Sequence, residues 1–234
     1  MHKIIKTATM LKIRFFQFIV IGILIFSCQK QSILKSDKIL NEIFSKSEII
    51  EIEKMIKYVD DYVIESTKNK DINQAYHLFL DKLNQTIQDS SRFLVPFKEE
   101  EKYEFLESLD SLTFNEFWRM RSQVKTARYK DSIYKDLEGF KSLNLRPYGR
   151  YRVYLEKIGS EDEFYKLLKE SLDVAGDLPT STAIWFPMNN KEFDFTIPKN
   201  RLWVAIYILR IEEHHDKKME RYLKQKNSMH NSKI

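Results

Sequence analysis

Glycine and cysteine are both scarce in this chain, which has five glycines and one cysteine among its 234 residues. A single cysteine excludes a disulfide framework within the chain and a zinc site built from several cysteines. Four glycines follow residue 27, and their spacing fits no glycine-rich phosphate loop, dinucleotide-binding fingerprint or G-x-S-x-G nucleophile elbow. We therefore predict no cofactor.

Long hydrophobic runs are also lacking. The longest covers residues 15–26, a run of 12 residues interrupted by Gln17 and Gly22, whereas a helix needs about 20 residues to cross a bilayer. The residues before this run include four basic side chains and no acid: Lys3, Lys6, Lys12 and Arg14. This length and this charge are typical of an export signal, in which a positive segment precedes a short apolar region.

The apolar run ends in Ile25-Phe26-Ser27-Cys28, and this segment resembles the lipobox of bacterial lipoprotein signal peptides. Ile25 and Ser27 match the pattern, and Phe26 stands at a position that is usually small. The resemblance covers residues 1–28. It implies that residues 1–27 are removed and that Cys28 becomes a lipid-modified N-terminus. Several acyl chains form a stable anchor, since each buried CH₂ contributes ~0.8 kcal/mol.

An acylated Cys28 implies a location in the bacterial cell envelope. The protein would be anchored to the inner or the outer membrane, facing the periplasm, with membrane lipid as one partner. Two alternatives stay open, namely a signal peptide without lipid and an uncleaved N-terminal anchor. Residues 37–234 resemble no known family.

No strong charge of one sign is left once residues 1–27 are set aside. The remaining chain has 35 Lys and Arg residues against 34 Asp and Glu residues, although residues 217–234 contain six basic residues and one acid. Nucleic-acid-binding proteins present a basic face. We therefore predict no nucleic acid partner.

Helical periodicity dominates the rest of the chain and predicts a mainly α fold, an orthogonal multi-helix bundle. In residues 48–68, for example, isoleucines and valines recur at spacings of three and four, which places them on one helix face. After a short helix capped by Ser36 or Asp37, the predicted helices cover residues 48–68, 72–88, 98–109, 113–121, 129–143, 150–158, 161–174 and 198–226. We assign residues 28–36 to a tether, 37–226 to a single helical domain and 227–234 to a disordered basic tail.

Residues 181–197 break the helical pattern. Phe193, Phe195 and Ile197 alternate with polar residues, a period of two that is typical of a strand. A proline and two asparagines separate this segment from the apolar residues 181–186. The pattern predicts at most one short β-hairpin, near residues 181–197.

The same region offers a candidate protein-binding surface. Trp185, Phe186 and Met188 surround a proline in the predicted hairpin. Rigid aromatic side chains in such segments often anchor protein interfaces. The alternative is that these three residues cover one end of the helical core.

A second candidate binding segment covers residues 146–154. Arg146, Arg150 and Arg152 alternate there with tyrosines, which suits recognition of a carboxylate, a phosphate or a sugar. The alternative is a helix with its tyrosines directed inward and its arginines reaching to the solvent.

The best metal candidate is the set Glu212, His215 and Asp216. On a continuous helix these residues would share a face, because they are three and four positions apart. Glu-x-x-His is a ligand spacing of di-iron helical bundles, but such sites need a second copy that this sequence lacks. The alternative is a solvated helix end with ordinary surface ion pairs.

Three functions follow from these observations. The anchor and the lack of catalytic motifs favour a non-catalytic protein-interaction module, such as an immunity-type lipoprotein or an accessory subunit of an envelope complex. The Arg/Tyr segment suits a receptor for a small ligand or a glycan. The metal candidate suits a metal-dependent envelope enzyme, so enzymatic activity stays undecided, with its absence favoured.

Overall fold

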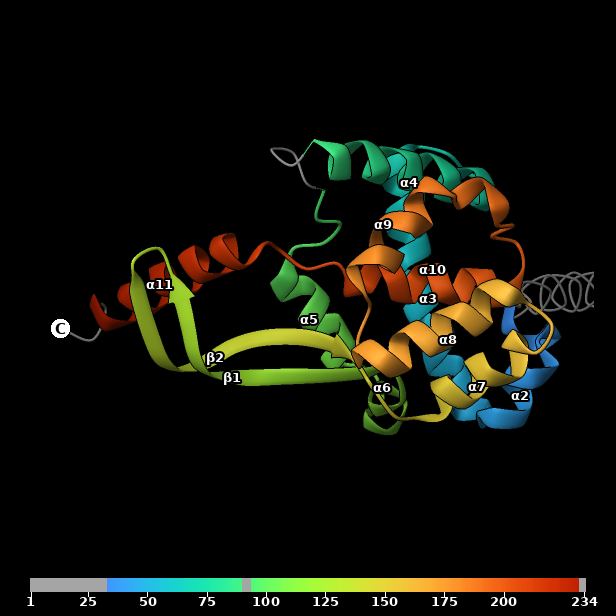
Figure 1. The fold of residues 1–234 in the computed structure, drawn as a ribbon, viewed down its shortest axis with the longest axis horizontal. Helices are drawn as coiled ribbons and strands as arrows, with labels where there is room; N and C mark the ends of the chain where they lie inside the picture. The colour runs from blue at the N-terminus through green and yellow to red at the C-terminus, as the bar shows by residue number, and fades with distance from the viewer. Residues whose placement is uncertain (1–32, 90–93, 232–234) are drawn as a thin grey trace, which may run out of the picture.

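The computed structural model describes residues 33–89 and 94–231, which form ten α-helices and one antiparallel two-stranded hairpin (Figure 1). The predicted class, mainly α with one hairpin, is confirmed. Cys28 lies outside the described residues. Within them, no helix is both long enough and apolar enough to cross a membrane.

The first helices begin at side chains that cap them. Asp37 caps α2 (Lys38–Ile43), Ser45 and Glu48 form a capping box on α3 (Lys46–Thr67), and Asp71 caps α4 (Ile72–Gln88). The tether predicted for residues 28–36 is wrong over its last part. Residues 33–36 form the 3₁₀ helix η1 (Ile33–Ser36), and Leu34 is fully buried in the core.

The hairpin lies in a segment that was predicted to be helical. After α5 (Glu99–Glu107) and α6 (Ser111–Phe117), strands β1 (Trp118–Tyr129) and β2 (Ser132–Leu145) pair in antiparallel register. The helices predicted for residues 113–121 and 129–143 are therefore wrong beyond Phe117. Cross-strand pairs such as Val124 with Leu137 fix the hairpin instead of contacts between successive helical turns.

The hairpin predicted near residues 181–197 is replaced by helix α9 (Thr180–Met188) and the 3₁₀ helix η3 (Asn190–Glu192). Phe193 and Phe195 are both buried in the core. Phe193 and Phe195 therefore alternate with polar residues because both side chains pack into the helical bundle. This segment does not pair as a strand. Asn190 holds this segment in place, because its amide donates to Asp81 and to the carbonyl of Pro187, both at 2.8 Å.

The remaining helices are α7 (Arg150–Gly159), α8 (Glu163–Ala175), α10 (Pro198–Arg210) and α11 (His215–Asn231). The predicted helix 198–226 is interrupted, because the chain leaves the helix at residues 211–214 and starts again at His215. Helix α11 continues to Asn231. The disordered tail predicted for residues 227–234 is therefore wrong for residues 227–231.

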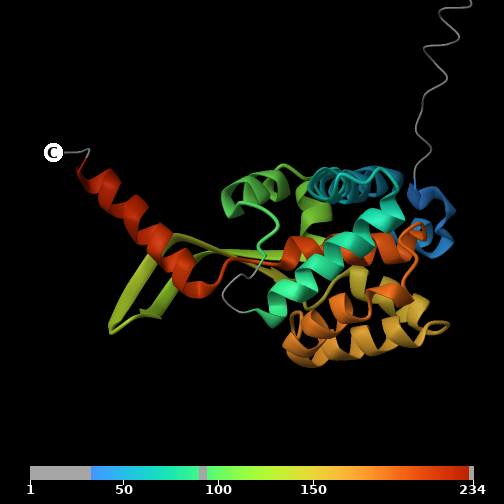
Figure 2. The same cartoon turned by 90° about the horizontal axis from the view of Figure 1, so that it is seen from above.

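Two hydrophobic clusters divide the molecule. Helix α10 is the centre of the large cluster, since every residue from Leu202 to Leu209 is buried. A small second cluster joins the hairpin to α11 through Ala127, Leu137, Phe140 and Met219. We call β1, β2 and α11 together the arm, and the other described elements the body. The arm extends from one end of the body, and η1 and α2 lie at the opposite end (Figures 1 and 2).

Candidate functional site

Helix α9 carries the predicted binding residues, and buried aromatic contacts hold it in place. Phe186 is fully buried, and its ring lies 4.8 Å from the ring of Tyr207 and 5.0 Å from that of Phe193. Pro187 is buried as well. Phe186 is therefore part of the core, and the prediction that it contacts a partner is wrong.

The other two predicted residues of this segment lie at the surface. Trp185 is 40% exposed and Met188 54% exposed, and Ile184 is exposed beside them. The indole of Trp185 is stacked on Phe164, with the ring centroids 5.6 Å apart and an angle of 20° between the planes. This contact orders the indole and leaves part of it accessible, which is typical of an interface anchor.

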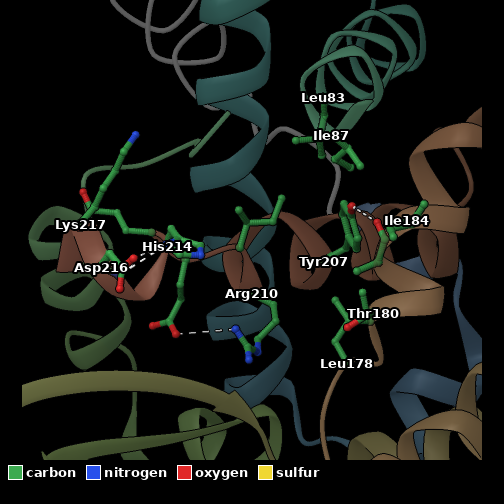
Figure 3. Close-up of a pocket in the computed structure, with 14 residues that line it drawn as sticks. Leu83, Ile87, Leu178, Thr180, Ile184, Tyr207, Arg210, His214, Asp216 and Lys217 are labelled. Carbon is green, nitrogen blue, oxygen red and sulfur yellow. Dashed lines mark hydrogen bonds and ion pairs between the residues drawn. The ribbon is translucent and has the colours of Figure 1, made fainter. Parts of the chain in front are cut away.

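A cleft of about 900 Å³ lies on one side of α9, bounded by α4, α10 and the segment that leads into α11 (Figure 3). Its apolar wall is formed by Leu83, Ile87, Leu178, Ala183, Ile184, Tyr207 and Ile211. Its other lining residues are polar or charged: Thr180, Arg210, Glu212, Glu213, His214, Asp216 and Lys217. This volume lies within the usual range of small-molecule sites, which is roughly 300–1,000 Å³.

A second hollow, of about 470 Å³, lies on the other side of α9, between α9 and α8. Leu167 and Trp185 line it, and both are exposed. Serines, a threonine and Glu192 supply its few polar atoms. Helix α9 therefore forms a ridge between two mainly apolar hollows.

Two charged groups of the large cleft, Arg210 and Glu212, are bonded within the protein. Arg210 donates to Asp177 at 2.6 Å. Glu212 accepts hydrogen bonds from the Tyr103 hydroxyl and, at 2.9 Å, from the backbone N–H of Leu143, and it lies 3.1 Å from the Lys218 ammonium. Glu212 thus connects α5, β2 and α11. These contacts fix the root of the arm.

The predicted metal set does not come together. Glu212 precedes α11 and is engaged as described above, and His215 Nε2 lies 3.0 Å from the carbonyl oxygen of Arg128. Asp216 is exposed at the start of α11. Across residues 33–89 and 94–231, no group of three His, Cys, Asp or Glu side chains is arranged to hold a metal ion. The break after Arg210 removes the helix face on which the prediction depended.

The three predicted arginines have different surroundings. Arg150 forms ion pairs with Glu48 and, at 3.1 Å, with Glu116, and this arginine lowers the pKa of Glu48 to about 2. Arg146 is exposed, whereas Arg152 is buried. They form no common patch. Most of the neighbouring tyrosines point inward, as the alternative interpretation predicted: Tyr151 and Tyr154 are buried, and Tyr148 is exposed.

Sequence patterns missed a buried network of charges at the root of the arm. Glu99 is fully buried and lies 3.1 Å from the ammonium of Lys218 and 2.9 Å from the guanidinium of Arg221. Lys102 is also fully buried and donates to the carbonyl oxygen of Ile211 at 2.7 Å. Burial lowers the pKa of Lys102 to about 8, although the charges of Glu212 and Glu99 oppose the shift. No local signal marks these residues, because Lys218, Arg221 and Ile211 are more than 100 positions away from them in the sequence.

Comparison with known proteins adds no relative: no family model, no curated protein and no solved structure matches this chain.

Proposed function

We propose that this protein is a lipid-anchored, non-catalytic interaction module of the bacterial cell envelope, and that it binds another envelope protein through α9. The observation that carries the proposal is the ridge formed by Ile184, Trp185 and Met188, which is exposed between two mainly apolar hollows. Exposed apolar groups gathered at one place mark interaction sites more often than single ones do.

The aromatic contacts of α9 support protein binding in particular. Trp185 is already ordered by its stacking on Phe164, so less side-chain entropy is lost when a partner covers it. The hollow between α8 and α9, which Trp185 lines, can accept an apolar side chain of the partner beside the indole, and the large cleft can accept others next to Ile184. Hot spots in protein interfaces have this arrangement of an aromatic anchor and fitted pockets.

The proposed anchor is consistent with an accessible ridge. Cys28 lies five residues before Ile33, and five residues span at most ~18 Å. An acylated Cys28 would hold the η1–α2 end near the membrane and direct the arm away from it (Figure 1). An immunity-type lipoprotein and an accessory subunit of an envelope complex both fit this arrangement.

The binding surface can be tested by recovery of partners. Tagged full-length protein is cross-linked in cells and purified from the envelope, as wild type and as Trp185→Ala and Met188→Ala. Two exposed apolar residues far from α9 give matched controls, Ile50→Ala on α3 and Leu112→Ala on α6. We expect Trp185→Ala to lower recovery of the partner by about tenfold or more, as truncation of a hot spot does. Equal recovery from all five proteins would contradict the proposal.

The anchor has its own test. Cys28→Ala should release the protein from the membrane fraction or stop removal of residues 1–27, and the mass of the wild-type N-terminal peptide should include the acyl groups. Unchanged fractionation of Cys28→Ala, together with an unmodified wild-type peptide, would refute lipidation and leave the α9 proposal standing.

A further inference from the structure

Arg152 is a buried cation whose hydrogen-bonding groups are mostly unused. Its side chain is 7% exposed, and its Nε donates to the carbonyl oxygen of Arg146 at 3.2 Å. Among the described residues, neither of its two terminal nitrogens has a hydrogen-bond partner, and neither does the buried Tyr151 hydroxyl. Buried charged groups normally have partners because leaving them unpaired is costly. The arrangement therefore points to a missing acceptor.

The acids nearest to Arg152 are engaged elsewhere. Asp173 and Asp177 both favour the charged form of Arg152 electrostatically. Asp173, however, pairs with Lys169 at 2.9 Å, and Asp177 pairs with Arg210 at 2.6 Å. The terminal nitrogens of Arg152 are therefore left without an acceptor among residues 33–89 and 94–231.

A surface pocket of about 450 Å³ lies against Arg152, between the start of α7 and the end of α8. Tyr148 and Val174 line it and are exposed, as is Val153 on α7. These three side chains offer an apolar surface to a ligand. The pocket is therefore both open to solvent and adjacent to the unpartnered cation.

The same pocket has charges of both signs. Arg152 and the N-terminal end of α7 make one part positive. Glu156 and the C-terminal end of α8 make another part negative, whereas Asp173 is paired with Lys169, which also lines the pocket. The side chain of Glu156 is exposed and has no hydrogen bond or close ion pair with any described residue, although the charge of Lys169 acts on it. A ligand that matches this pattern carries an anion and a cation close together.

We propose that this pocket binds a small zwitterion, an amino acid with an apolar side chain. Its carboxylate accepts hydrogen bonds from the two terminal nitrogens of Arg152, whose planar fork suits a carboxylate. Its ammonium lies toward Glu156, and its side chain lies against Tyr148. A phosphate dianion fits less well, because its second negative charge would face the carboxylate of Glu156.

The terminal nitrogens lie below the surface of the empty pocket, so the guanidinium turns toward the ligand when it binds. Among the described residues, this rotation breaks one side-chain hydrogen bond, from Nε to the carbonyl oxygen of Arg146. Two charge-assisted bonds to the carboxylate replace it, and such bonds are about twice as strong as neutral ones.

Leucine is a suitable probe, because two of its analogues each lack one charge. Isothermal titration of the full chain should show saturable binding of leucine. Leucinamide, which has no carboxylate, and 4-methylpentanoate, which has no ammonium, should each bind about tenfold more weakly or worse. Absence of saturable leucine binding up to about 10 mM, or equal binding of inorganic phosphate, would overturn the proposal.

Variants locate the site. Arg152→Met should abolish leucine binding, and Glu156→Gln should weaken it about threefold or more. Glu156 is exposed and unpaired among the described residues, so its replacement leaves the fold intact and keeps the test valid if Arg152→Met is unstable. Glu170→Gln is the matched control, because Glu170 is an exposed acid that lies outside this pocket, on α8. Leucine binding that survives in both Arg152→Met and Glu156→Gln would overturn the proposal, whether or not α9 binds a partner.

Discussion

Helix α10 in the body buries every residue from Leu202 to Leu209, whereas helix α11 in the arm, over residues 215–228, buries one apolar side chain, that of Met219. The body is held by a continuous apolar cluster. The strand residues nearest the body, Trp118, Leu143 and Leu145, belong to that same cluster. The rest of the arm is held by a small cluster and by buried charges at its root. The body therefore depends on the removal of apolar surface from water, whereas helix α11 also depends on electrostatic contacts.

Charge separates the two regions as well. The arm with its hairpin turn, residues 118–145 and 215–231, has 12 Lys and Arg residues against five Asp and Glu residues, whereas residues 33–117 and 146–214 have 21 against 29. Glu99 is an acid of the body that pairs with Lys218 and Arg221 of the arm. The opposite charges therefore meet at the root, where burial strengthens their attraction. We expect the arm to detach from the body before the body unfolds.

The largest effect should come from the centre of the body. Trp203→Ala removes a buried indole from α10 and should lower the free energy of unfolding by about 3–5 kcal/mol, because a cavity is left behind. Urea denaturation followed by circular dichroism measures this change. A decrease below about 1.5 kcal/mol would show that α10 is less central to stability than its burial indicates.

The root of the arm should be the next most sensitive place. Glu99→Gln removes the fully buried charge that faces Lys218 and Arg221 and should cost roughly 3 kcal/mol, because the buried ammonium of Lys218 loses one of its two carboxylate partners. Hydrogen exchange should become faster in α11 and change much less in α10. An equal acceleration in both helices would show that arm and body unfold together.

The small cluster of the arm should matter less. Phe140→Ala removes the contact with Tyr222, whose ring centroid lies 5.4 Å away, and should cost about 2–3 kcal/mol within the arm. Exchange in α11 again measures the effect. The urea midpoint of the body should hardly move, and a shift as large as that of Trp203→Ala would contradict the division into two regions.

The smallest effect is a dependence of stability on pH. The pKa of Lys102 is about 8 in the folded protein, whereas its ordinary value, which applies to the unfolded chain, is 10.5. Between these values the unfolded chain binds more protons than the folded chain, so stability rises with pH. From pH 8 to 10 the wild type should gain up to about 2 kcal/mol relative to Lys102→Met. A parallel pH profile of the two proteins would show that Lys102 keeps an ordinary pKa.

Helices that pack through one apolar face could be predicted from the sequence. The spacing of apolar residues predicted a helix over residues 72–88, and these are the bounds of α4. Gly176 was predicted to end the preceding helix, and it ends α8 in the left-handed conformation that favours glycine. The hairpin could not be predicted in the same way. Its buried face is covered by α11, which follows about 70 residues later, so residues 118–145 show no simple alternation.

The proposed binding site was predictable in part. The tryptophan two residues before Pro187 was visible in the sequence, and the structure exposes it. Its neighbour Phe186 points into the core, because this segment is a helix and not a hairpin. The unpartnered nitrogens of Arg152 and the charges around Glu99 could not be predicted. Both depend on which distant elements bring acids and bases together, and composition does not contain that information.

The ridge on α9 is the central claim, and site-specific photo-cross-linking tests it most directly. A photoreactive amino acid is placed at position 188 in the full chain, and, as a matched control, at the equally exposed position 50 on α3. We expect irradiation of cells to join the position-188 protein to one envelope protein, and Trp185→Ala to suppress this product. The position-50 protein should give no such product. The same product from both positions, or none from position 188, would show that α9 is not the binding surface.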